Sequence, residues 1–106
     1  MKYLKLYEQL NKTQIGDYVI CQQDFITKEL EKFLSENVGQ VIDYTTLYNY
    51  TIVKYTNIPR NIQAHFDNIH PNCRIFSHDE IIYNSPNIED CEMFIEIFLS
   101  QQKYNL

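Results

Sequence analysis

The sequence predicts an α+β fold, in which about five short antiparallel strands form one curved sheet and helices stand between and beyond them. Three observations point to this class. Several short runs alternate apolar and polar residues, other segments repeat apolar residues at helical spacing, and the two glycines, Gly16 and Gly39, stand where predicted strands begin. With 106 residues, 44% hydrophobic and 14% aromatic, the chain is long enough for one core. We therefore expect a single domain over residues 1–106.

The N-terminal part of the chain is predicted to hold two helices and one strand. The apolar residues of segment 3–10 have the spacing of a short amphipathic helix. After a turn at Gly16, the β-branched run 18–22 predicts a strand. Asp24 is a candidate N-cap for a helix over residues 25–35, in which apolar residues recur every third or fourth position. This helix is thus expected to be inserted between the first two strands.

The middle of the chain has the pattern of a β-hairpin. Residues 38–44 predict its first strand, and residues 47–55 alternate in the manner of a second, antiparallel strand. One face of this second strand carries Tyr48, Tyr50 and Ile52, and the other carries Leu47, Thr51, Val53 and Tyr55.

Shorter elements follow the hairpin. Pro59 suits the first position of a helical turn, because its fixed backbone angle matches the helix. Residues 73–76 predict a short strand, and residues 81–83 predict another. Between them, Ser77 and Glu80 have the spacing of a capping box, which predicts one helical turn.

A final helix is predicted over residues 86–102, beyond a curved sheet that forms the core over residues 16–83. Its first turn is acidic, as the helix dipole prefers. Its apolar stripe is made of Ile88, Cys91, Ile95, Phe98 and Leu99, and is widened by Met93, Phe94 and Ile97.

The charge and cysteine content exclude several classes of protein. The formal net charge is −5, which argues against a protein that neutralises the phosphates of DNA. No apolar run is long enough to span a membrane and the start has no secretory signal, so we expect a cytoplasmic protein without membrane contact. Cys21, Cys73 and Cys91 are far apart and odd in number, which predicts reduced thiols.

The order of the predicted strands resembles a small SH3-like barrel of the Tudor or KOW kind. In such barrels a strand with a Gly-Asp start is followed by a glycine-containing strand, a Tyr-x-Val-x-Tyr type strand, and a short pair with a helical turn. The matching segments here are 16–20, 38–42, 50–55, 74–76 and 81–83. The resemblance implies an antiparallel barrel that binds other macromolecules. The helix predicted over residues 25–35 departs from it, because many such barrels have a loop there.

A second resemblance covers most of the chain. The start Met1–Glu8, the segment Tyr50–Pro59, the acidic last helix and the ending Lys103–Leu106 are similar to uncharacterised small proteins of AT-rich large phages and giant DNA viruses. The single alanine beside 14 isoleucines and 10 asparagines fits an AT-rich genome. The resemblance implies a viral accessory protein in the cytoplasm of a host cell, and it carries no activity across.

The tyrosines of the hairpin are the candidate contact surface. Barrels of this type bind ligands through aromatic residues on an exposed strand face, and a phenol suits a half-wet interface. Tyrosines at alternate strand positions are equally typical of core and cross-strand pairs. The candidate binding residues are Tyr44, Tyr48, Tyr50, Lys54, Tyr55 and Arg60.

All three histidines lie within one short segment that also contains a cysteine. His65, His70, Cys73 and His78 could supply four zinc ligands, but their spacing matches no standard finger. Cys73 beside His70 or His78 could also form a nucleophilic pair, although no glycine-rich turn for an oxyanion accompanies it. We therefore expect no cofactor and no catalytic residue.

The sequence thus predicts a non-enzymatic protein-interaction module, with a host or viral protein as its partner and inhibition of a host factor as one form of action. The acidic charge favours a basic partner. The alternative is an RNA-binding module that uses Lys54, Arg60, Arg74 and the tyrosines. A zinc-stabilised or Cys/His enzyme is the second alternative. The oligomeric state is left open by the sequence.

Overall fold

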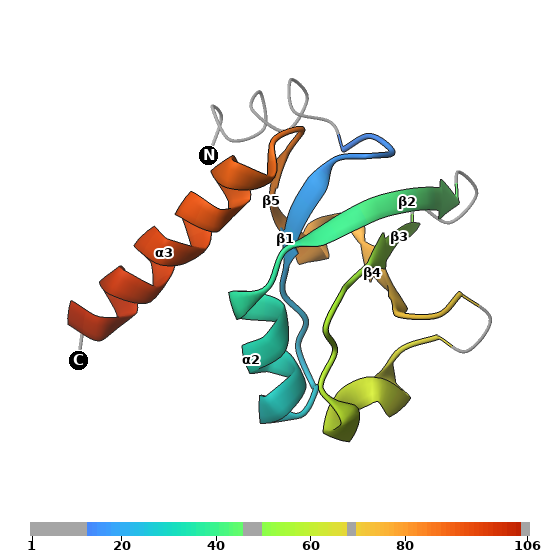
Figure 1. Ribbon diagram of the computed structural model, residues 1–106, viewed down its shortest axis with the longest axis horizontal. Helices are drawn as coiled ribbons and strands as arrows, with labels where there is room; N and C mark the ends of the chain where they lie inside the picture. The colour runs from blue at the N-terminus through green and yellow to red at the C-terminus, as the bar shows by residue number, and fades with distance from the viewer. Residues whose placement is uncertain (1–12, 46–49, 68–69, 105–106) are drawn as a thin grey trace.

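The computed structural model describes residues 13–45, 50–67 and 70–104, with side chains to residue 101, and shows the α+β fold that the sequence predicts (Figure 1). Five antiparallel strands form one sheet in the order β4-β3-β2-β1-β5. The strands are β1 (Tyr18–Cys21), β2 (Gly39–Thr45), β3 (Tyr50–Lys54), β4 (Cys73–Ser77) and β5 (Ile81–Ser85). In the described part of the chain no backbone ladder joins β4 to β5, so the sheet is curved but open.

The described helices flank the sheet (Figure 1). They are α2 (Lys28–Glu36), α3 (Ile88–Tyr104) and two 3₁₀ turns, η1 (Arg60–His65) and η2 (His78–Glu80). The capping box predicted at Ser77 and Glu80 is confirmed: the Ser77 amide donates to Glu80 Oε1 at 2.9 Å, and η2 follows. The helix predicted over residues 3–10 lies outside the described residues.

The predicted start of α2 is wrong. The helix begins at Lys28 and its N-cap is Thr27, whose hydroxyl oxygen accepts from the Leu30 amide at 3.2 Å. Asp24 does not cap it. Phe25 has a φ of 61°, a left-handed conformation that no helix contains, so helical geometry cannot start there. The apolar spacing over this segment is therefore helical only from Lys28 onward.

Phe25 is also fully exposed, with a relative exposure of 106%. A bulky side chain in the left-handed region costs about 1 kcal/mol. Because the ring contacts no core, replacing Phe25 by glycine is expected to raise the free energy of unfolding by about 1 kcal/mol. A urea titration of the two proteins measures this difference, and a loss of stability in Phe25→Gly would show that the ring is held by contacts.

The core is an aromatic cluster between α2 and the sheet. Phe33 of α2 packs on Tyr55 with ring centroids 5.5 Å apart, and Tyr55 packs on Phe66 and Phe76 at 5.9 and 6.3 Å. Tyr55 is 1% exposed and Phe76 is 0% exposed. The alternation predicted for the second hairpin strand is confirmed over its described part, because Thr51 and Val53 are buried while Tyr50 and Lys54 are exposed.

The two glycines serve different purposes. Gly16 has a φ of +97°, which suits the turn before β1. Gly39 is buried at the start of β2, and a Cβ there would lie 2.8 Å from a carbon of the Tyr55 ring and would overlap Val53. The missing side chain of Gly39 therefore lets the Tyr55 ring pack against β2.

Side chains join the loop after β1 to β4. Gln23, beyond the end of β1, donates to the Ile75 carbonyl of β4 at 3.3 Å and to Glu80 Oε1 at 3.1 Å. Arg74 donates to Gln23 Oε1 at 2.6 Å and to the His65 carbonyl at 2.6 Å. These side-chain hydrogen bonds hold the loop after β1 against β4, where no backbone pairing joins these two described segments.

Candidate binding groove

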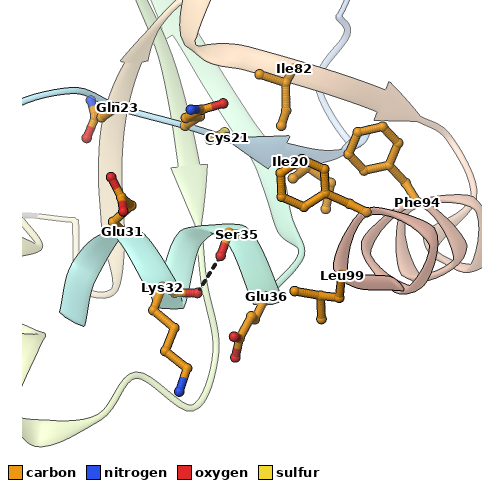
Figure 2. Close-up of a pocket in the computed structure, with 12 residues that line it drawn as sticks. Ile20, Cys21, Gln23, Glu31, Lys32, Ser35, Glu36, Ile82, Phe94 and Leu99 are labelled. Atoms are coloured by element: carbon orange, nitrogen blue, oxygen red, sulfur yellow. Dashed lines mark hydrogen bonds between the residues drawn. The ribbon is translucent and has the colours of Figure 1, made fainter. Parts of the chain in front are cut away.

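A groove of about 320 Å³ lies between α2 and α3, over the end of β1 (Figure 2). Its volume is at the low end of the range for ligand pockets. The wall formed by α3 is apolar, and the wall formed by α2 is polar. The lining residues are Ile20, Cys21, Gln22, Gln23, Glu31, Lys32, Ser35, Glu36, Ile82, Phe94, Phe98 and Leu99.

The apolar wall is built by α3 and β5. Phe94 stacks on Tyr83 of β5 with ring centroids 4.7 Å apart and an interplanar angle of 14°. Phe98, one turn further along, lies 6.3 Å from Phe94 and nearly parallel to it. This row of rings fixes α3 on the sheet and points apolar surface into the groove, where Leu99 remains 37% exposed.

The polar wall is the outer side of α2. The inner side of this helix buries Leu30, Phe33 and Leu34 in the core, so the residues between them face outward. Glu31, Lys32, Ser35 and Glu36 line the groove from this helix, and Ser35 donates to the Lys32 carbonyl at 2.9 Å. Figure 2 shows Glu36 beside Leu99, where the polar wall meets the apolar one.

The thiols of the chain are poor nucleophiles. Burial raises the pKa of the Cys21 thiol to about 12, although the neighbouring Tyr55 hydroxyl opposes the rise. Burial, with help from the Asp90 carboxylate, raises the pKa of Cys91 to about 11. Burial also raises the pKa of Cys73. All three thiols are buried and keep their protons at neutral pH, whereas a nucleophile must be a thiolate.

The structure does not bring the predicted binding tyrosines onto one face. Tyr55 belongs to the core, so it is removed from the candidate surface. Tyr44 is paired with Thr51, whose side chain is buried, so both side chains lie on the face of the sheet that covers the core. Tyr44 is nevertheless 47% exposed, because it lies past the end of the core. Tyr50 is 44% exposed on the opposite face. Tyr48 lies outside the described residues.

A register shift explains the separation of Tyr44 from Tyr50. The pairing of β2 with β3 shifts between Val41 and Asp43, and this extra residue reverses the alternation of everything that follows it in β2. Lys54 shares the outward face of β3 with Tyr50, while Arg60 is exposed at the start of η1. Of the candidates that the structure describes, Tyr50 and Lys54 share a face, while Tyr44, Tyr55 and Arg60 lie elsewhere.

The four residues considered for zinc are also dispersed. Among the residues that the structure describes, no group of three or more His, Cys, Asp or Glu side chains is placed to hold a metal ion. His65, His70 and His78 are exposed, and Cys73 is buried with its thiol directed to the Pro71 carbonyl at 3.6 Å. His70 lies 3.5 Å from Asp67 instead.

The residues proposed for RNA contact are partly engaged elsewhere. Arg74 donates to Gln23 and to the His65 carbonyl, so its guanidinium is held within the fold. Lys54 and Arg60 are exposed, but β3 and η1 carry them separately.

The groove is not among the sites that the sequence predicts. Phe98 and Leu99 are predicted only as members of the apolar stripe of the last helix. A signal was present, because the apolar stripe of the last helix was too wide for one packing face. In the structure α3 leaves Leu99 37% exposed in the groove, and Met93 and Ile97 exposed outside the groove lining.

A scan against models of known protein families finds no match, and neither does a search of curated proteins or of solved structures. No helix in the described ranges combines the length and apolar character needed to cross a bilayer.

Proposed function

We propose that the protein is a non-enzymatic protein-interaction module whose partner binds in the groove between α2 and α3. The apolar wall of the groove carries this proposal. Phe94, Phe98 and Leu99 of α3 line it, and Leu99 is 37% exposed. Contiguous apolar surface with a polar rim marks interaction sites on proteins.

The arrangement of the strands supports a barrel-type module. The order β4-β3-β2-β1-β5, with the 3₁₀ turn η2 between β4 and β5, is the order expected of an SH3-like barrel. Gln23, just after the inner strand β1, donates to the Ile75 carbonyl of the edge strand β4. Under this proposal the helix α2 is an insertion that adds a binding wall to the barrel.

The proposed setting follows from the resemblance to small viral proteins. An accessory protein of a phage or large DNA virus acts in the cytoplasm of its host, and a module without catalytic groups acts there by occupying a surface. The buried, protonated thiols support the absence of a covalent step.

Leu99→Asp tests the proposal. A carboxylate at this position places a charge in the apolar contact, so capture of the native partner from its source cells is expected to weaken about tenfold or more. Ile75→Asp is the matched control, because Ile75 is 48% exposed on β4, away from the groove. Equal capture by the wild type and Leu99→Asp, with loss in Ile75→Asp, would move the binding surface to the sheet.

A further inference from the structure

We infer that the occupant of the α2–α3 groove is a basic amphipathic helix of a partner protein, an inference that rests on the proposed function and names the chemistry of the partner. The two walls of the groove demand an occupant with two faces. An apolar face would lie against Phe94, Phe98 and Leu99, and a polar face would lie against α2.

Charge favours a cationic polar face on the occupant, because two of the three charged side chains that line the groove, Glu31 and Glu36, are carboxylates and the third is Lys32. The described side chains of α2 and α3 include seven carboxylates but two lysines, Lys28 and Lys32. The carboxylates are Glu29, Glu31, Glu36, Glu89, Asp90, Glu92 and Glu96. Among the described residues the ion pair is formed by His70 and Asp67, which belong to neither helix. Within that part of the fold, the carboxylates of α2 and α3 therefore have no cationic partner. Lysines or arginines of an incoming segment would supply one.

The groove favours a helix over an added strand. Strand addition needs a sheet edge with free backbone groups. On β4, one of the two edge strands, backbone groups are already used. The Cys73 carbonyl accepts from the Asp67 amide, the Ile75 carbonyl accepts from Gln23, and the Ser77 amide donates to Glu80. The groove is lined mainly by side chains of α2 and α3, together with residues 20–23 and Ile82. A third helix packs between two others by the ordinary rules of helix contact.

A designed probe tests the inference without the native partner. The probe is a synthetic helix of about 18 residues, ~27 Å long, with leucine on one face and lysine on the other. Its controls are the same peptide with glutamate for lysine and a scrambled peptide of equal composition. Fluorescence anisotropy is expected to show that the lysine peptide binds, that salt weakens the binding, and that the controls bind at least about tenfold more weakly.

Two charge reversals locate the binding. Glu31→Lys with Glu36→Lys is expected to weaken the lysine peptide about tenfold. Glu29→Lys with Asp79→Lys makes the same change in net charge outside the groove lining and is expected to leave most of the affinity. Equal loss in both double variants, or no binding to the wild type, would overturn the inference.

The same variants separate this inference from the proposed function. If capture of the native partner depends on Leu99 but not on Glu31 and Glu36, the groove binds a partner of other chemistry and the inference alone fails. A peptide of residues 1–12, which carries three lysines, is titrated in parallel. Tighter binding of that peptide, or a dimer in sedimentation that Leu99→Asp dissociates, would assign the groove to this chain and overturn the inference.

Discussion

Replacing Gly39 by alanine is expected to destabilise the protein by about 3 kcal/mol, the upper end of the range for overpacked cores. The added methyl group would lie 2.8 Å from the Tyr55 ring and would overlap a methyl of Val53. Neither neighbour can move away easily, because Val53 is 0% exposed and Tyr55 is 1% exposed. Urea unfolding followed by circular dichroism measures the loss.

A double variant separates this overlap from other effects. Val53→Ala removes the methyl group that the new Cβ would meet, so Gly39→Ala and Val53→Ala together are expected to cost less than the sum of the two single changes. Gly16→Ala is a further control, because no atom lies within 4 Å of its added Cβ and only the backbone angle opposes it. A tolerated Gly39→Ala, or strict additivity with Val53→Ala, would contradict the packing described for the Tyr55 ring.

Stability is expected to fall steeply at alkaline pH. The pKa of the Cys21 thiol is about 12 in the folded protein against an ordinary value of 9.0. Below pH 9.0 both states keep the proton and the full stability is present; between 9.0 and about 12 the unfolded thiol loses its proton while the folded one keeps it. The free energy of unfolding therefore falls by about 1.4 kcal/mol per pH unit for this thiol alone.

Burial also raises the pKa values of Cys91 and Tyr55, so they add to the alkaline loss in the same direction. Unfolding titrations on both sides of pH 9.0, the ordinary thiol pKa, measure the slope. Cys21→Ala is expected to make that slope shallower by about 1.4 kcal/mol per unit. If this variant keeps the slope of the wild type, the Cys21 thiol is not protected in the folded state.

Much of the sheet could be predicted because it depends on local pattern. The alternation around Val53 and the capping box at Ser77 depend only on residues that are close in the sequence, and both are confirmed. The start of α2 was wrong because apolar spacing does not reveal the left-handed backbone of Phe25. The face of the sheet on which Tyr44 lies depends on a register shift in β2, and the apolar pattern of β2 does not indicate that shift.

The groove could not be predicted, because it depends on the distance between two helices. Glu31 and Leu99 are far apart in the chain, and the packing of α3 on the sheet and of α2 on the core determines that they line one space. Burial of Tyr55 is a similar case. Its position in the strand allowed either a core or a contact role, and the space left by Gly39 decides for the core.

The groove is the central claim, and photo-crosslinking from position 99 tests it most directly. A photoreactive phenylalanine analogue replaces Leu99 in one protein and Ile75 in another, and both are irradiated in the source cells. A covalent adduct with the partner is expected from position 99 and none from position 75. Adducts from position 75 alone would contradict the groove as the binding surface.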